Sequence, residues 1–271
     1  FKEYYDYCKL DFEEDWNEYS MYGGMPYLLM CKTNEQKIKY LDNLFKETYI
    51  KDIVNRHDIK NTEVLEDVLN IISSSVGSLT NPNKLSNSFK SMKNLVVAPN
   101  TIKQYLDYCV DSFLIEKAYR YDVKGKKYLD TPLKYYYTDI GLRNVRLGFR
   151  QQEENHIMEN IIYNELIIRG YQVDVGVVTI SEKNENNNYV RKQLEVDFIC
   201  NLGYERLYIQ SALNIDDVEK KEQEEKSLIK IDDNFRKIII VKSNIKKWKD
   251  EKGILILGLK EFLTCPESIN S

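Results

Sequence analysis

Apolar residues recur at helical spacing through most of the first half of the chain. From Asn34 to about His57 they lie on one side of a continuous helical pattern without Gly or Pro. Helices are also predicted from Thr62 to Val76, with Thr62 as N-cap, and from Ser86 to Met92. A further amphipathic helix follows Asn100, its predicted N-cap, with apolar residues at i, i+3, i+4 and i+7. The first half is therefore predicted to be largely helical.

Two strands are predicted next, Leu114 to Tyr121 and Leu133 to Tyr137, joined by the lysine-rich turn Asp122–Lys127. Three helices followed by a hairpin with a basic tip is the order of a winged helix. Its third helix would be the recognition element and the hairpin its wing.

This order predicts a set of residues that contact nucleic acid. They are Lys103 on the third helix and Lys124, Lys126 and Lys127 on the wing. Asp107 and Asp111 share the exposed face of the same helix and would repel phosphate. A winged helix that contacts protein instead of DNA therefore remains the alternative.

Helical and strand patterns alternate in the last third of the chain. A helix is predicted from Glu153 to Arg169, stopped by Gly170. The elements predicted after it are the strands Tyr171–Ile180 and Val190–Ile199 around an Asn-rich loop Ser181–Asn188, the strand Leu207–Ala212, the helix Asp216–Ile229, the strands Ile238–Val241 and Gly253–Leu257, and the helix Leu259–Leu263. This order predicts an α/β domain with a mixed sheet.

Candidate chemistry lies in this last third. Glu159 borders the apolar face of its helix, and Asp197 lies in Leu-Glu-Val-Asp-Phe-Ile, where alternation would place Glu195 and Asp197 on one face and Leu194, Val196 and Phe198 on the other. Gln210 lies on the next strand and shares a face with Ala212.

A helix carboxylate, a strand Asp and an acid-x-Lys pair are how a metal-dependent nuclease gathers its ligands and its Lys. Here Gln210 is neutral and Ala212 stands at the Lys position. The sequence predicts a vestigial catalytic set of Glu159, Asp197 and Gln210, in which Glu159 and Asp197 bind Mg²⁺ or Mn²⁺ weakly. The alternative for Glu159 is a helix-start carboxylate favoured by the macrodipole or reaching solvent.

Composition sets wider bounds. With 271 residues, 42% hydrophobic and 30% charged, the chain can form two or three folded units. Its 5 Cys are odd in number and widely spaced, which indicates reduced thiols in a cytoplasmic protein, and 2 isolated His are too few for a His-based metal site. No apolar run is long enough for a bilayer span, so no membrane partner is predicted. Because the sequence opens at Phe1 without Met, we expect a fragment or processed form.

Charge is distributed unevenly. Lys84 to Arg150 carries 13 basic and 6 acidic residues, or +7, while the net charge of the whole chain is −4. The remainder therefore carries −11. A basic middle in an acidic chain is consistent with a nucleic-acid surface or with a merely solvated face.

Several segments resemble a known family. Ile157 to Tyr171, Glu-Val-Asp-Phe-Ile and Tyr-Ile-Gln are similar to the C-terminal PD-(D/E)XK nuclease-like domain of a large group of prokaryotic AAA+-like P-loop ATPases. The eleven-residue spacing from Glu159 to Gly170 and the thirteen-residue spacing from Asp197 to Gln210 match archaeal Holliday-junction resolvases, which are relatives in that superfamily.

The resemblance continues upstream. The segments Tyr22-Gly-Gly-Met-Pro-Tyr, Tyr49-Ile-Lys-Asp-Ile-Val, Thr101-Ile-Lys-Gln-Tyr-Leu and Lys134-Tyr-Tyr-Tyr-Thr-Asp-Ile-Gly-Leu look like the lid, winged helix and connector of the same group. It implies a multidomain protein: a helical lid remnant at 1–57, a winged helix and connector at 58–150, and an α/β nuclease-like domain of unknown function with a mixed sheet at 151–271. No P-loop motif occurs, so the ATPase motor and its ATP site lie outside this chain.

We therefore expect a binding module for DNA or protein, coupled to the missing motor of a parent ATPase, and not an enzyme in its own right. Two alternatives remain. One is an active Mg²⁺-dependent DNA nuclease. The other is a protein-interaction module of a defence or toxin-like system.

Overall fold

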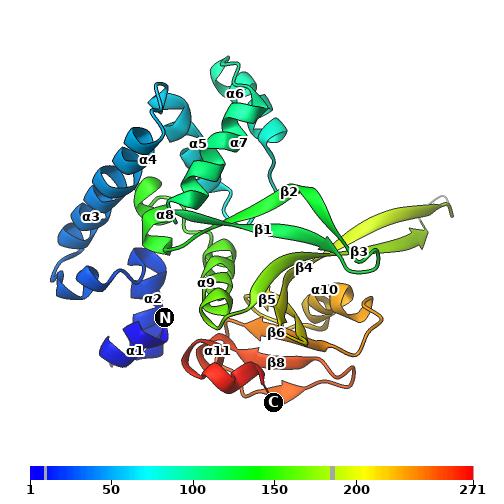
Figure 1. The fold of residues 1–271 in the computed structure, drawn as a ribbon. Helices are drawn as coiled ribbons and strands as arrows, with labels where there is room; N and C mark the ends of the chain where they lie inside the picture. Colours follow the sequence, from blue (N-terminus) through cyan, green and yellow to red (C-terminus); the bar gives the residue numbers. More distant parts are fainter. Residues whose placement is uncertain (9–10, 184–186, 271) are drawn as a thin grey trace. The chain divides into compact units, whose positions relative to one another are not determined.

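The computed structural model describes residues 1–8, 11–183 and 187–270. The chain forms two compact units (Figure 1). The first consists of Phe1, Glu3–Lys117 and Pro132–Ile161, and the second of Lys2, Ala118–Thr131 and Ile162–Ser271. From Glu3 onward, the chain crosses between the units twice within a β-hairpin, after Lys117 and after Thr131, and once within a helix, after Ile161. The three-part division at 57 and 150 is based on sequence motifs and stays a prediction.

The N-terminal part of the first unit is helical. Its elements are α1 (Lys2–Cys8), α2 (Phe12–Tyr22), the 3₁₀ segment η1 (Pro26–Met30), α3 (Asn34–Asn43), the π-helical segment η2 (Leu44–Ile50) and α4 (Lys51–Arg56). The Thr33 side chain caps α3 by accepting a hydrogen bond from the Gln36 N–H. The continuous helix predicted from Asn34 is confirmed, with a π-helical stretch in its middle.

Three further helices follow: α5 (Thr62–Ser74), α6 (Pro82–Lys93) and α7 (Pro99–Asp111). Both predicted caps were wrong by one or two positions. Asn61 caps α5, because its Oδ1 accepts the Val64 N–H at 3.3 Å. Helix α7 begins at Pro99, since proline tolerates the first helical position, where no N–H partner is needed.

The hairpin is formed by β1 (Ile115–Asp122) and β2 (Lys127–Tyr137), and α8 (Ile140–Arg146) follows it. Asp139, just before α8, accepts the backbone N–H of Gly24 and that of Gly141, each at 2.8 Å. A Cβ at position 141 would lie 1.9 Å from the Tyr22 carbonyl oxygen, so only glycine fits there. Two segments far apart in sequence are thereby joined within the first unit.

The second unit carries most of an eight-stranded mixed sheet with the strand order β2-β1-β3-β4-β5-β6-β8-β7. Its elements are the second half of α9 (Glu154–Ile168), β3 (Gln172–Lys183), β4 (Tyr189–Leu202), β5 (Glu205–Ala212), α10 (Val218–Ile229), β6 (Arg236–Val241), β7 (Trp248–Lys249), β8 (Leu255–Gly258), α11 (Leu259–Thr264) and the 3₁₀ segment η3 (Pro266–Ile269). The predicted α/β order with a mixed sheet is confirmed. Part of the predicted Asn-rich loop, residues 184–186, lies outside the described residues.

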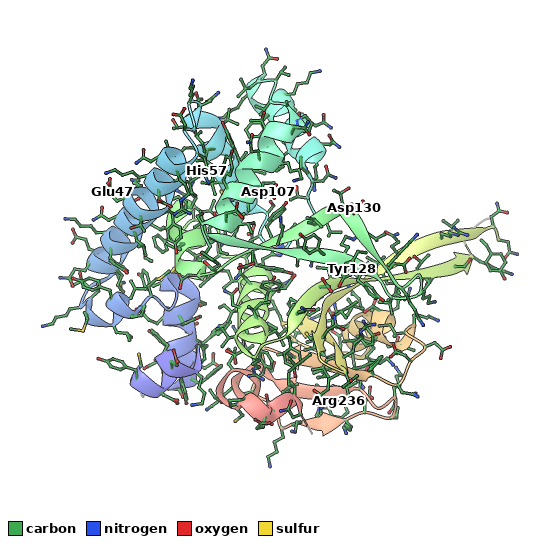
Figure 2. The ribbon with its side chains drawn as sticks, viewed as in Figure 1. Glu47, His57, Asp107, Tyr128, Asp130 and Arg236 are labelled. Atoms are coloured by element: carbon green, nitrogen blue, oxygen red, sulfur yellow. The ribbon has the colours of Figure 1, made fainter. Side chains whose placement is uncertain are left out.

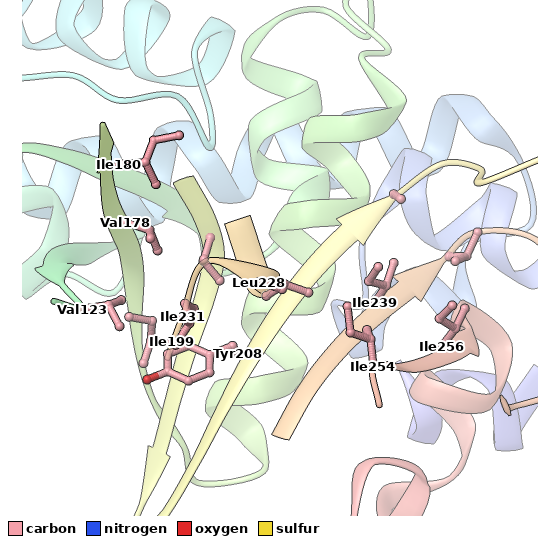
Figure 3. Close-up of a cluster of buried hydrophobic side chains, with 13 residues drawn as sticks. Val123, Val178, Ile180, Ile199, Tyr208, Leu228, Ile231, Ile239, Ile254 and Ile256 are labelled. Atoms are coloured by element: carbon pink, nitrogen blue, oxygen red, sulfur yellow. The ribbon is translucent and has the colours of Figure 1, made fainter. Parts of the chain in front are cut away.

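Pairing in this sheet changes direction along the order of strands. β4 pairs antiparallel with both β3 and β5, whereas β5, β6 and β8 run parallel to one another. A crossover through α10 is what a parallel β5–β6 pair requires. A cluster of buried side chains, among them Val178, Tyr208, Leu228 and Ile239, packs the strands against α10 (Figure 3).

Candidate functional site

Asp197 lies at a β-bulge in the middle of β4. The pairing with β3 changes from Asp174–Ile199 to Gly176–Val196, so two residues of β4 oppose a single residue of β3. Val196 and Ile199 consequently both enter the buried cluster, and Phe198 packs instead against Tyr163 of α9. The predicted alternation was wrong at Phe198, because a period of two does not continue through a bulge.

The Asp197 carboxylate is directed at the neighbouring strand. Its Oδ2 accepts hydrogen bonds from the Ser211 backbone N–H at 2.8 Å and from the Ser211 hydroxyl at 3.1 Å. The residue is buried, with 8% of its surface exposed. Two donors from β5 thus stabilise the carboxylate in this position.

Gln210 uses both ends of its amide. Its Oε1 accepts the Asp197 backbone N–H at 3.4 Å, and its side chain forms a hydrogen bond with Glu224 of α10. Burial raises the pKa of Glu224, and the Gln210 hydrogen bond partly offsets that effect. A glutamate at 210 could accept but not donate, and it would place a second carboxylate beside Glu224. The surroundings of position 210 therefore favour an amide side chain over a carboxylate.

Position 212, where the resemblance to nucleases would place a lysine, holds alanine. Ala212 is 6% exposed and belongs to the buried apolar cluster. The three lysines on the following helix all have partners: Lys220 bonds to Asn214 at 3.1 Å, Lys221 pairs with Glu225 at 3.2 Å, and Lys226 pairs with Glu182 at 2.8 Å. The side chain at position 212 thus supplies no positive charge that could activate a water.

A cavity of about 540 Å³ adjoins Gln210 between β4, β5 and α10. Its lining is polar and of mixed charge: Lys192, Leu194, Glu195, Gln210, Glu219, Glu222, Gln223, Lys226 and Ser227. Across the residues that the structure describes, no three His, Cys, Asp or Glu side chains are grouped so that they could share a metal ion.

Glu159 belongs to the first unit, and its partners there are basic and phenolic. Its Oε1 accepts hydrogen bonds from Lys134 Nζ at 2.8 Å and from the Tyr136 hydroxyl at 2.5 Å. All three side chains are buried. The predicted position of Glu159 at the border of the apolar face is explained by this ion pair, which balances its charge within the protein. Asp197 and Gln210 are in contact within the second unit, and Glu159 belongs to the first unit.

The predicted nucleic-acid-binding lysines fall into two groups. Lys103 pairs with Asp107 at 2.7 Å, and Asp107, which is labelled in Figure 2, also binds Lys117 at 3.0 Å. Burial raises the pKa of Asp107, but the hydrogen bonds from the two lysines outweigh it and the net shift is downward. Lys103 is therefore neutralised locally.

The hairpin lysines are different. Lys124, Lys126 and Lys127 are exposed, and none of them has an ion pair with any residue in the described ranges. They lie at the tip of the hairpin, close in sequence to Tyr128 and Asp130 on β2 (Figure 2). Three unpaired cations on one turn leave their charge available to an anionic partner.

A cavity of about 730 Å³ opens beside this tip within the second unit. The turn between β4 and β5 contributes Tyr204, β5 contributes Arg206, and the segment after α10 contributes Phe235. These three residues were not predicted as functional. Their signal in the sequence is weak, since each is a single aromatic or basic residue in a polar connection.

Comparison with protein families gives a match over residues 13–153, just over half of the chain, to a domain of unknown function, DUF8612. The chain belongs to the DUF8612 family. The matched region contains the helices α2 to α8 and the hairpin. Most of the second unit lies beyond it.

Two curated relatives of this DUF8612 chain are uncharacterised proteins. One, from Haemophilus influenzae, is 35% identical over 225 residues, covering 83% of this chain and 52% of that protein. The other, from Methanocaldococcus jannaschii, is 28% identical over 208 residues, covering 76% of this chain and 44% of that protein. The chain therefore spans about half the length of these relatives.

No solved structure matches the DUF8612 chain. Among the helices in the described part of the chain, none is both long and apolar enough to cross a membrane.

Proposed function

We propose that this chain is a DNA-binding module whose nuclease-like domain has lost its catalytic set. The observation that carries the proposal is the hairpin tip, where Lys124, Lys126 and Lys127 are exposed and lack acidic partners within the described residues. Lysines without local partners can neutralise phosphates and release their counterions. The order α5, α6, α7, β1, β2 supports the interpretation of this region as a winged helix.

The arrangement around Asp197 supports the loss of catalysis. The order of α9, β3, β4, β5, α10 and β6 is compatible with the nuclease-like domain that the resemblance implies. In such a domain Asp197 and the residue at 210 would face a metal ion. Here Asp197 is bound by Ser211, and Gln210 is bound by Glu224 and by the Asp197 backbone. Neutral Gln210 and buried Ala212 leave neither a third carboxylate nor a general acid or base.

The proposed context is a longer protein of the cytoplasm. The matched residues cover only about half of each relative, which leaves room in them for a further domain. We propose that an AAA+-like ATPase motor occupies that region, because the Tyr22 and Lys134 segments resemble the lid and connector of such ATPases. On this proposal the chain couples DNA binding to the motor and binds no ATP itself.

The test is DNA affinity against salt concentration, measured by fluorescence anisotropy on duplexes of several sequences. Replacing Lys124, Lys126 and Lys127 with Glu should weaken binding to every sequence alike. Each lost phosphate contact should also remove about 0.9 from the slope of log affinity against log salt.

A control triple, Lys32→Glu, Lys39→Glu and Lys60→Glu, changes the net charge equally at exposed positions of the first unit. It should retain most of the affinity. Equal affinity of wild type and the hairpin triple would refute the hairpin as the DNA contact. If wild type bound no DNA at all, the alternative of a protein-interaction module would replace the proposal.

A further inference from the structure

The cavity beside the hairpin tip is bounded by three connections of the second unit. Lys124 and Lys126 come from the hairpin, Gly203 and Tyr204 from the β4–β5 turn, and residues 231–235 from the segment after α10. On its inner side lie Val123, Tyr208 and Ile231, which belong to the buried cluster shown in Figure 3. The floor of the cavity is thus part of the rigid core of this unit.

Aromatic rings are exposed at this cavity. Tyr204 is fully exposed on its turn, and Phe235 is 42% exposed. Phe235 keeps an edge contact with Tyr208, whose ring centroid lies 6.5 Å away. An apolar ring held partly in water at the rim of a cavity gains free energy when a flat partner covers it.

A guanidinium lies between Phe235 and Tyr121 of the hairpin. The Arg206 guanidinium carbon is 5.7 Å from the centroid of Phe235 and 5.2 Å from that of Tyr121. Its Nε donates to Asn201 Oδ1 at 2.8 Å, which fixes the plane of the group. Arginine planes and aromatic faces are both surfaces on which nucleic-acid bases stack.

The acidic residues of the cavity are largely engaged by the protein. Asp233 accepts the Tyr208 hydroxyl at 2.6 Å and the Phe235 N–H at 3.1 Å. Glu205 lies 3.8 Å from Arg236. Asp232 is exposed and contributes one negative charge, whereas the unpaired Lys124 and Lys126 contribute two positive charges. The balance of unpaired charge at the cavity is therefore positive.

We propose that this cavity binds unpaired bases of single-stranded nucleic acid, with Tyr204 and Phe235 stacking on bases and the hairpin lysines contacting phosphates. The inference rests on the proposed function, in which those lysines contact phosphate. It adds the partner's chemistry: bases present their faces to Tyr204 and Phe235 only when they are not paired and stacked inside a duplex. Exposed rings interleaved with cations are the arrangement of surfaces that bind single strands without sequence preference.

The experiment compares a thymidine 20-mer with a 20-base-pair duplex. Tyr204→Ala and Phe235→Ala should each weaken binding of the single strand by about 5- to 100-fold, and leave duplex binding within about twofold. Tyr189→Ala removes another exposed tyrosine, at the opposite end of β4, and should change neither affinity.

A second readout does not depend on losing a side chain. Phe235→Trp keeps a ring at the cavity, so it should retain single-strand affinity, and stacking should quench its added emission when the 20-mer binds. Wild type, with Trp16 and Trp248 alone, gives the background.

The outcomes separate the two proposals. If Tyr204→Ala and Phe235→Ala leave single-strand affinity unchanged, or wild type fails to bind the 20-mer, the stacking proposal is overturned. The hairpin proposal survives that result if the triple Glu variant at Lys124, Lys126 and Lys127 still weakens duplex binding. It fails if wild type and the triple variant bind the duplex equally.

Discussion

The side-chain oxygen of Gln210 lies 3.4 Å from the backbone nitrogen of Asp197 and accepts its hydrogen bond across two adjacent strands. The same amide also bonds to Glu224 on the helix that packs on these strands. If the resemblance to nucleases holds, an active relative would present a negatively charged oxygen to a metal ion from this position. In this chain the Gln210 side chain instead links β4, β5 and α10. Its role is therefore structural.

Glu224 makes that link sensitive to pH. Burial raises its pKa above the ordinary value of 4.5. A carboxyl whose folded pKa is raised contributes most to stability below its unfolded pKa, and the contribution is lost as pH rises through the folded pKa. Glu224→Gln removes the charge and keeps an acceptor for Gln210. The variant should therefore be more stable than wild type at pH 8, and the difference should shrink toward pH 4.5.

Urea unfolding at several pH values measures this difference. Glu222→Gln, on the exposed side of the same helix, is the control and should show little dependence on pH. A Glu224→Gln effect of the same size at pH 5 and pH 8 would show that the carboxyl does not titrate as the structure implies.

Restoring a lysine at position 212 should cost stability. Ala212 is enclosed by apolar side chains, so Ala212→Lys would bury an ammonium group at a cost on the order of several kcal/mol. Val190→Lys, at a half-exposed position of β4, should cost less than about 1 kcal/mol. Thermal unfolding of both variants measures the contrast. If Ala212→Lys were as stable as Val190→Lys, position 212 would have access to solvent, and a functional lysine there would be feasible.

Lys134 and Glu159 should be coupled in stability. Lys134→Met leaves a buried carboxylate beside Tyr136 without its cation, and should destabilise the protein by about 3–5 kcal/mol. The double variant with Glu159→Gln should recover much of that loss, because no buried charge remains. A double-mutant cycle by urea unfolding gives the coupling energy. Additive effects would mean that the ion pair contributes nothing, and would leave Glu159 available for another role.

Regular elements could largely be predicted from the sequence. The helix from Asn34 and the strands around Asp197 follow apolar periods that depend only on local pattern. Helix starts were less certain, because Asn61 and Thr62 are both good caps and only the backbone geometry decides between them.

The candidate site was less predictable, since it depends on contacts between distant residues. The bulge at Asp197 arises from a mismatch of pairing between β3 and β4, which no single strand encodes. Glu224 is one of several acids on a charged helix, and the sequence does not show which of them faces Gln210. Lys134 lies in the segment Lys134–Leu142, whose sequence gives no sign of its partner, because the pairing with Glu159 requires two separate elements to meet.

The central claim, that the chain binds DNA without cutting it, is tested most directly by incubating the unmodified protein with supercoiled, linear and branched DNA in Mg²⁺ or Mn²⁺. Binding is followed in the same samples by electrophoretic mobility. The account predicts retarded DNA that stays intact, with no more than trace cleavage, because Gln210 and Ala212 supply neither charge nor a proton relay. Robust metal-dependent cleavage that disappears in Asp197→Ala would contradict it and identify the chain as an active nuclease.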